Sequence, residues 1–332
     1  MHAPNFKPHP LFSGCHRQTI ISTFVNFCRA PFSRTEYVHL PDHDWLAMEV
    51  TTPPSWKPDE LTVVMVHGLC GSHKSPYQVR MARKLAAKGV RAVRVNLRGC
   101  GSGKGLARSP YSAGCSNDIL CALKQLKFET PDTRILLMGF SLGGNIVLKL
   151  AGELGNTDLV ERVIAISPPA DLMSSMKLIE HPRNRIYERY FMKHLLEDMS
   201  YRLKKFPESP RYEIPSELRA LDYDTFYLAP LFGYRNVFDY YRNNRALEHI
   251  QNIVIPCQIL FAEDDPIIDA SMLDNCKLPE NIDVFKTVSG GHLGYISAPG
   301  TEGGIRWLDY FLLGLIFGSK TQNESNSPIF PE

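Results

Sequence analysis

Six nearly continuous apolar runs recur along the 332-residue chain, and helical patterns separate most of them. Such runs are typical of strands that are buried on both faces of a parallel sheet. Alternation of strands with helices implies right-handed crossover connections, so the prediction is an α/β fold with a mostly parallel, doubly wound sheet. The runs begin at Leu61, Val90, Arg134, Arg162, Cys257 and Asn281.

Two further strands and three helices complete the predicted core. TEYVHL and WLAMEV flank the turn residues Pro41 to Asp44, which favours a β-hairpin at residues 35–50. Apolar residues at helical spacing predict helices over residues 77–88, 119–126 and 143–154, and Gly89 follows the first of them as a C-terminal stop signal.

The strand pattern stops between Asp171 and Ile253, where long amphipathic helix candidates replace it. A helical insert within such a sheet predicts a cap over the carboxyl edge, where open α/β folds bind ligands. The alternative is a second, independent helical domain. The predicted organisation is an N-terminal extension packed on the core (1–34), the core (35–170 and 253–317), the cap (171–252) and a flexible tail (318–332).

Composition excludes several function classes. The chain is 44% hydrophobic and 22% charged with a net charge of +2, which gives no electrostatic reason to expect nucleic-acid binding. Eight scattered cysteines form no CxxC pair, which favours reduced thiols in the cytoplasm over disulfides or a zinc site. The N-terminal residues lack the pattern of a secretory signal.

The most apolar segment is Trp307 to Phe317, which Asp309 interrupts. It is well short of the roughly 20 residues that span a bilayer. Leu308, Phe311, Leu312 and Leu315 share one helical face, which predicts a buried helix. The alternative is a transient contact of this helix with a lipid or membrane surface.

One serine lies at the junction of a predicted strand and a predicted helix, within Gly139-Phe140-Ser141-Leu142-Gly143. The G-x-S-x-G pattern by itself is weak, but this context is that of a nucleophile elbow. In such a turn the serine takes a positive φ angle, and a side chain at either glycine would collide across the turn. We therefore predict that Ser141 is a catalytic nucleophile.

A serine nucleophile needs a base and an orienting acid, which follow it in the order acid, then histidine, in this kind of fold. Asp264 and Asp265 end the strand that begins at Cys257, and the only histidine downstream of them is His292. His292 is therefore the predicted base. Either aspartate fits the position of the acid.

The tetrahedral intermediate needs two backbone N–H donors. We assign one to Leu142, directly after the nucleophile, and one to Leu69, in the turn after the first buried strand. His67 precedes the nucleophile in the chain, so we expect it to organise that turn through hydrogen bonds. A zinc site at His67, Cys70 and His73 lacks the usual ligand spacing.

Together these motifs resemble the α/β-hydrolase superfamily and, within it, the YheT-like hydrolases, whose eukaryotic relatives include membrane-associated acylglycerol and phospholipid lipases. The resemblance covers about residues 8 to 315. The residues that carry it are His16-Arg17-Gln18-Thr19, His67-Gly68-Leu69, Gly71-Ser72, Ser75-Pro76-Tyr77, Asn96 to Cys100, Gly139 to Asn145, Asp264-Asp265-Pro266 and Gly290 to Tyr295.

The resemblance implies an α/β-hydrolase fold and a Ser-Asp-His carboxylic ester hydrolase that acts on short- to medium-chain acyl esters without a cofactor or metal. It places the acid at Asp265, ahead of Pro266, and leaves Asp264 as a structural acid that accepts loop amides. Cys70 departs from the branch, in which a polar or acidic residue is common at this position of the oxyanion turn.

We therefore predict a cytoplasmic serine esterase whose partner is a small acyl ester, with monoacylglycerols as one candidate class. The alternatives are acyl transfer to an alcohol by the same residues and a non-catalytic, ligand-binding homologue. The sequence leaves the oligomeric state open. Aromatic residues of the cap predict an apolar pocket for acyl chains of about four to ten carbons, and packing within the cap is the alternative for any one of them. They are Tyr187, Tyr190, Phe191, Phe226, Tyr227, Phe232 and Tyr234.

Overall fold

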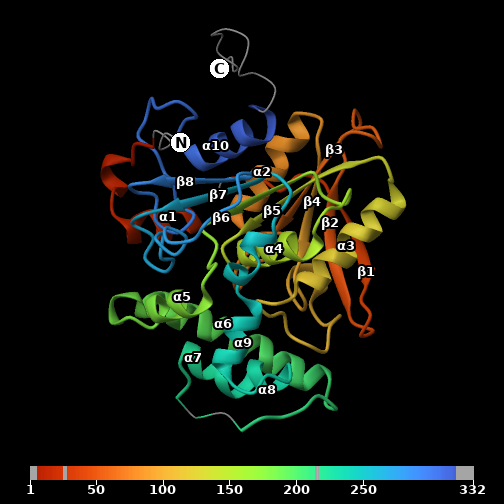
Figure 1. Cartoon of the computed structure of the whole chain (residues 1–332), viewed down its shortest axis with the longest axis vertical. Helices are drawn as coiled ribbons and strands as arrows, with labels where there is room; N and C mark the ends of the chain where they lie inside the picture. Colours follow the sequence, from red (N-terminus) through yellow and green to blue (C-terminus); the bar gives the residue numbers. More distant parts are fainter. Residues whose placement is uncertain (1–5, 25–27, 214, 216, 319–332) are drawn as a thin grey trace.

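A single eight-stranded sheet forms the centre of the molecule (Figure 1). The computed structural model describes residues 6–24, 28–213, 215 and 217–318, so the predicted tail lies almost wholly outside the described residues. The strand order is β1-β2-β4-β3-β5-β6-β7-β8. The strands are β1 (Arg34–His39), β2 (Trp45–Thr51), β3 (Leu61–Val66), β4 (Arg91–Asn96), β5 (Arg134–Phe140), β6 (Arg162–Ile166), β7 (Cys257–Ala262) and β8 (Ile282–Thr287).

The pairing confirms the predicted α/β class. The strands β1 and β2 form the expected antiparallel hairpin, and β2 pairs antiparallel with β4. The other neighbouring pairs in the sheet, which are β4 with β3, β3 with β5, β5 with β6, β6 with β7 and β7 with β8, are all parallel. Because parallel strands all end at one edge, the segments that follow β3, β5, β7 and β8 meet there. These segments contain every residue that the sequence predicts for the active site.

Helices cover both faces of the sheet. Successive residues of β3 point to opposite faces: Val64 and Val66 contribute to one buried cluster, and Val63 and Met65 to the other. The first cluster contains apolar residues of α3 and α4, and the second contains those of α2 and α10. These helices are α2 (Pro76–Ala87), α3 (Ser116–Glu129), α4 (Leu142–Leu154) and α10 (Trp307–Phe317).

The apolar segment at the end of the described chain is the helix α10. Leu308 and Leu312 are almost fully buried, and Phe311 and Leu315 pack against the same cluster. The prediction of a buried helix is therefore confirmed. No helix among the described residues is long and apolar enough to cross a membrane.

The chain between β6 and β7 is helical, and its described residues include no strand. Its helices gather on one side of the molecule, beside an edge of the sheet (Figure 1). Most of their buried apolar residues belong to a third cluster, which includes Met192, Tyr223 and Tyr240. The helices are α5 (Leu172–Ile179), α6 (Arg185–Lys205), α7 (Ala220–Tyr223), the π-helical turn η4 (Asp224–Leu228), α8 (Ala229–Leu231) and α9 (Val237–Asn244).

A further helix precedes the sheet in the chain. It is α1 (Cys15–Phe24), and it lies beside β8, the last strand in the sheet order, and beside the loops near that strand (Figure 1). Gln18 is fully buried there. Its side-chain Nε2 donates to the carbonyl of Ile296, and its Oε1 accepts from the amide of the same residue, at 2.9 and 2.7 Å. These two bonds fix α1 against the segment that follows β8.

Candidate active site

Ser141 lies in a sharp turn between β5 and α4. Its φ angle is +53°, a conformation that non-glycine residues rarely adopt. A Cβ atom at Gly139 would lie 2.2 Å from the carbonyl oxygen of Gly143, and one at Gly143 would lie 2.4 Å from the carbonyl oxygen of Val66. Both glycines are therefore required by steric contact, as expected of a nucleophile elbow.

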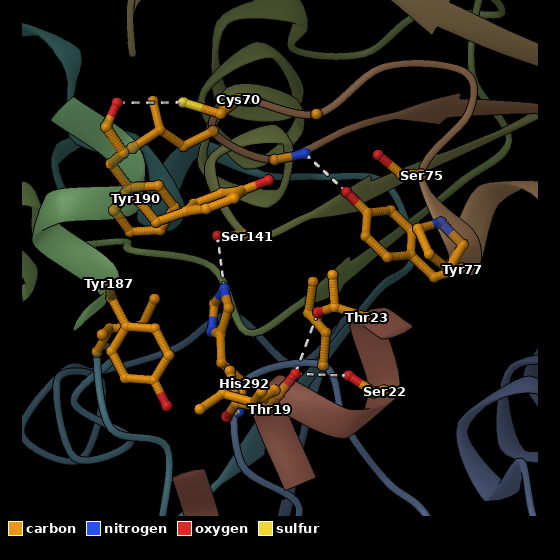
Figure 2. Close-up of a pocket in the computed structure, with 18 of the residues that line it drawn as sticks. Thr19, Ser22, Thr23, Cys70, Ser75, Tyr77, Ser141, Tyr187, Tyr190 and His292 are labelled. Atoms are coloured by element: carbon orange, nitrogen blue, oxygen red, sulfur yellow. Dashed lines mark hydrogen bonds between the residues drawn. The ribbon is translucent and has the colours of Figure 1, made fainter. Parts of the chain in front are cut away.

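The structure brings Ser141, His292 and Asp265 together in one chain of hydrogen bonds. His292 Nε2 lies 2.9 Å from Ser141 Oγ, a contact that is visible in Figure 2. His292 Nδ1 lies 2.8 Å from Asp265 Oδ2. With Nδ1 donating to the carboxylate, Nε2 is left as an acceptor for the serine proton. This is the geometry that activates a serine hydroxyl.

The Asp265 side chain is held by its own loop. Its Oδ1 accepts the amides of Ile267 and Ile268, both at 3.0 Å, while Oδ2 faces His292. Its side chain is 1% exposed. The carboxylate thus has fixed partners on both oxygens and cannot rotate without breaking three hydrogen bonds.

Asp264 has a different environment. Its Oδ1 accepts the amide of Gly291 at 2.8 Å, which ties the loop after β7 to the loop after β8. Partial burial raises the pKa of this carboxyl, and the amide bond opposes that effect. Asp264 thus accepts a loop amide, as expected, and its role as a structural acid stays a prediction.

The predicted oxyanion donors lie beside the serine. Leu142 is the first residue of α4, where backbone amides have no partner within the helix. Around Leu69, the amide of Gly68 donates to the Tyr77 hydroxyl at 3.1 Å, and that of Cys70 donates to the Tyr111 hydroxyl at 3.0 Å. The Leu69 amide lies between these two amides in the chain, and no described residue accepts a hydrogen bond from it.

Tyr77 and Tyr111 were not singled out by the sequence as groups that shape this turn. Their hydroxyls hold the two amides next to Leu69, so the loop is fixed by side chains from outside it. A tyrosine gives no local signal of this role, since the contacts join residues 9 and 41 positions apart. Of the two, only Tyr77 belongs to a motif that carries the family resemblance, Ser75-Pro76-Tyr77.

His67 is the organiser of this turn that the sequence predicts. It is fully buried, its Nδ1 lies 2.8 Å from the Gly68 carbonyl oxygen, and its Nε2 accepts the Leu97 amide at 3.1 Å. Burial lowers the pKa of His67 to about 4. Both ring nitrogens are thus occupied by backbone groups, so His67 has no free nitrogen for proton transfer to a substrate.

The helix α1 supports the backbone of His292, which the sequence patterns do not predict. The Thr19 hydroxyl accepts the His292 amide at 2.8 Å and donates to the Cys15 carbonyl at the same distance. A side chain from α1 therefore fixes the backbone at the histidine. The only signal was the His16-Arg17-Gln18-Thr19 resemblance, which carried no structural role.

Two cavities meet at Ser141. The larger has a volume of about 290 Å³ and the smaller about 110 Å³, and both are lined by Ser141, Leu69, Phe191 and Ile267. The larger extends between α1 and α6, as the side chains drawn in Figure 2 indicate. The smaller lies between the core and the helices α5 to α9.

The aromatic residues proposed for an acyl pocket divide into two groups. Tyr187, Tyr190 and Phe191 line the larger cavity, and Phe191 also lines the smaller one. The other four line neither cavity, so for them the prediction is wrong. Tyr227 and Tyr234 pack within the helical segment, and Phe226 and Phe232 are partly exposed. Helical spacing alone does not separate packing from lining positions.

Cys70, the departure from the family pattern, lines the larger cavity. Its Sγ contacts the carbonyl oxygen of Phe191 on α6 at 3.8 Å. Burial raises the pKa of this thiol to about 12, so it stays protonated at neutral pH. Within the described part of the chain, no group of three or more His, Cys, Asp or Glu side chains could hold a metal ion.

Comparison with known families gives a direct match. The profile described as "alpha/beta hydrolase fold" matches residues 62–299, which is most of the chain. The chain belongs to the α/β-hydrolase fold family. This α/β hydrolase contains the eight-stranded, mostly parallel sheet and flanking helices of that fold, so the predicted fold is confirmed. The family match and the curated relatives below also confirm the prediction of a hydrolase.

Curated relatives place this α/β hydrolase in the YheT-like branch that the sequence indicated. It is 28% identical over 298 residues to "Putative esterase YheT" of Escherichia coli (strain K12), which covers 88% of this chain and 87% of the relative. It is also 28% identical over 255 residues to the "Monoacylglycerol lipase" of Saccharomyces cerevisiae, which covers 74% of this chain. This alignment spans only 56% of the yeast protein.

Among solved structures, Est1E of Butyrivibrio proteoclasticus with bound ferulic acid has a TM-score of 0.55 to this chain. The two are 15% identical, and the match covers 85% of this chain and 98% of Est1E. At this identity the similarity concerns the fold.

Proposed function

We propose that this α/β hydrolase cleaves carboxylic esters through a covalent acyl-enzyme, with Ser141 as nucleophile, His292 as base and Asp265 as the orienting acid. The observation that carries the proposal is the chain of hydrogen bonds from Asp265 through His292 to Ser141 Oγ, at 2.8 and 2.9 Å. The names of the curated relatives, an esterase and a monoacylglycerol lipase, support the same chemistry.

The proposed reaction has two steps. Ser141 Oγ attacks the ester carbonyl carbon while its proton passes to His292 Nε2, and the amides of Leu69 and Leu142 hold the oxyanion. The tetrahedral intermediate collapses, the C–O bond to the alcohol breaks, and His292 returns the proton to the departing oxygen. Water then attacks the acyl-enzyme with His292 again as base, which releases the acid and restores the Ser141 hydroxyl.

The helical segment 171–252 serves as the cap in this proposal. It contributes Tyr187, Tyr190 and Phe191 to the larger cavity and most of the lining of the smaller one. Largely apolar walls suit acyl chains, so the proposed substrates are small esters of short- to medium-chain acids, with monoacylglycerols among them. A cytoplasmic location stays a prediction, since the eight cysteines are scattered along the sequence and form no CxxC motif.

The decisive experiment combines labelling with a single substitution. A fluorophosphonate probe should modify Ser141 stoichiometrically, and Ser141→Ala should abolish the labelling and lower kcat for p-nitrophenyl hexanoate by a factor of about 10⁴ or more. Labelling that persists in Ser141→Ala, or activity within tenfold of the parent protein, would contradict the assignment. A circular dichroism spectrum equal to that of the parent protein shows that the variant is folded.

Water and an alcohol compete for the same acyl-enzyme, so acyl transfer is the second candidate. Hydrolysis in the presence of glycerol separates the two. The proposed hydrolase releases mainly free acid, whereas a transferase forms the new glycerol ester in preference to the acid even when water is in large excess.

A further inference from the structure

The two cavities at Ser141 differ in their relation to His292. This residue lines the larger cavity and is absent from the described lining of the smaller one, which contains Leu142 instead. Under the proposed function, on which this step rests, His292 protonates the departing alcohol oxygen. The alcohol part must therefore leave on the side of the larger cavity. The acyl chain is left with the smaller cavity.

The smaller cavity has mostly apolar walls on the core side. Leu142, Ile267 and Ile268 lie there next to Ser141. On the side of the helical segment the wall is also largely apolar, but several polar side chains interrupt it, and Ser175, Asp224 and Tyr241 are among them. Ser175 comes from α5, Asp224 from η4 and Tyr241 from α9.

Ser175 is a buried side chain without a partner. It is 3% exposed, and its Oγ has no hydrogen-bond partner among the described residues. A buried hydroxyl in this state has lost its contacts with water and has gained none in return, which is unfavourable. Ser174, the next residue on the same helix, instead donates to the Asp171 carbonyl at 3.1 Å.

Asp224 is the second unusual group of this wall. It accepts a hydrogen bond of 2.6 Å from the Tyr241 hydroxyl, and the described residues place no cation in an ion pair with it. The other carboxylate of the cavity, that of Asp198, is paired with Arg202. Burial raises the pKa of Asp224 to about 7, while the Tyr241 hydrogen bond opposes this shift.

Asp224 also begins the π-helical turn η4, a local irregularity that is frequent at functional sites. A carboxyl group without a cation and a hydroxyl without a partner thus line one small, largely apolar space. Groups of this kind are retained in binding pockets where they fix the orientation of a ligand.

We propose that the smaller cavity is an acyl pocket for chains that bear a hydroxyl group, which donates to Asp224 and accepts from Ser175. A hydroxyl is both donor and acceptor, so it satisfies a carboxylate oxygen and a serine hydroxyl together. An alkyl chain satisfies neither group. An ammonium group only donates, and it would lose its hydration against walls that are largely apolar.

The test compares matched pairs of p-nitrophenyl esters with the full chain. The pairs are 6-hydroxyhexanoate against hexanoate and 8-hydroxyoctanoate against octanoate. For at least one pair, kcat/KM should be about tenfold or more higher for the hydroxy ester, since a site built to bind a hydroxyl discriminates against the analogue that lacks it. Equal values for both pairs, or a preference for the alkyl esters, would overturn the proposal.

The variant Ser175→Ala tests whether the Ser175 hydroxyl causes the preference for hydroxy esters. Removing a buried hydroxyl without a partner breaks no hydrogen bond and relieves an unfavourable burial, so the variant should fold with a urea midpoint at least as high as that of the parent protein. It should bring the ratio of the two kcat/KM values close to one, whereas Ser174→Ala, the matched control, should keep the parent ratio. A parent ratio that persists in Ser175→Ala contradicts the assignment.

Two further substrates test the choice of ligand. p-Nitrophenyl 6-aminohexanoate should be the poorer substrate, and a preference for it over the hydroxy ester would overturn the choice of a hydroxyl. For 3-hydroxypropyl hexanoate against propyl hexanoate, Ser175→Ala should leave the ratio unchanged. A changed ratio would place the alcohol part in the smaller cavity and overturn the assignment.

Failure of this inference is distinguishable from failure of the proposed function. If hexanoate is cleaved in a reaction that requires Ser141 but the hydroxyl gives no advantage, only the inference fails. If no ester is cleaved, or cleavage persists in Ser141→Ala, both fail.

Discussion

The loops that follow β3 and β8 each present a histidine near Ser141, and the two histidines have opposite chemistry. His67 is fully buried, and backbone groups occupy both of its ring nitrogens. His292 faces a carboxylate with one nitrogen and the serine hydroxyl with the other, and it lines a cavity. The role of a histidine in this molecule thus depends on the partners of its nitrogens rather than on its distance from the nucleophile.

The two loops also differ in how they are held. The His67 turn is fixed by hydrogen bonds within itself and by the hydroxyls of Tyr77 and Tyr111. The His292 backbone is fixed from outside by Thr19 on α1, and the neighbouring Gly291 by Asp264. Under the proposed function, one loop supplies the oxyanion turn, and the other keeps a histidine side chain available for proton transfer.

The largest expected effect comes from removing the carboxylate that distinguishes His292. Asp265→Asn should lower kcat by a factor of about 10⁴, because an amide holds the imidazole in the wrong tautomer. Asp264→Asn is the matched control, which should lower the free energy of unfolding by about 1 kcal/mol and change kcat less than threefold. Steady-state kinetics and urea unfolding on both variants check this, and the reverse pattern would make Asp264 the orienting acid.

A smaller effect is expected from protonation of His67. Because its pKa in the folded chain is about 4 rather than 6.5, the unfolded chain binds an extra proton between these values. The stability that neutral His67 provides is thus complete above pH 6.5 and is lost as the pH falls toward 4, by about 3 kcal/mol in all.

Urea unfolding from pH 4 to 7 measures this contribution, with His67→Gln as the comparison. The variant is less stable at pH 7 but lacks the titrating ring, so the difference in unfolding free energy from the parent protein should shrink as the pH falls. Two curves that run parallel over this range would contradict a buried, neutral His67.

The smallest effect concerns the external support of the His292 loop. Thr19→Val removes the acceptor of the His292 amide and keeps the side-chain volume, so kcat should fall by about tenfold with little change in KM. Thr19→Ser, which keeps the hydroxyl, should restore most of the rate. If the serine variant is as impaired as the valine variant, the hydroxyl is not the group that positions the histidine.

Much of the fold follows from local patterns in the sequence. All eight strands were predicted, because a strand buried on both faces leaves an apolar run such as that of residues 61–66. The elbow at Ser141 was predictable since steric exclusion at Gly139 and Gly143 permits only one residue type there. The choice of Asp265 rather than Asp264 as the predicted acid depends on the family resemblance, because the two aspartates have the same local sequence context.

Other features depend on contacts between distant residues and leave no local pattern. The contact of Thr19 with His292 joins positions 273 residues apart. The small cavity is formed by α5, η4 and α9 against the core, so neither Ser175 nor Asp224 differs in sequence from an ordinary helix residue. For the same reason, Phe226 and Phe232 could not be separated from Phe191 before the helices were placed.

The pairing of Gln18 with Ile296, 278 residues apart, has a consequence for biosynthesis. A nascent chain that has completed the sheet through β7 still lacks His292 and the segment on which α1 docks. Closing so long a loop belongs to the slow, late events of folding. Under the proposed function, turnover of an ester thus reports that both ends of the core have met, and a chain still in translation is inert toward the esters around it.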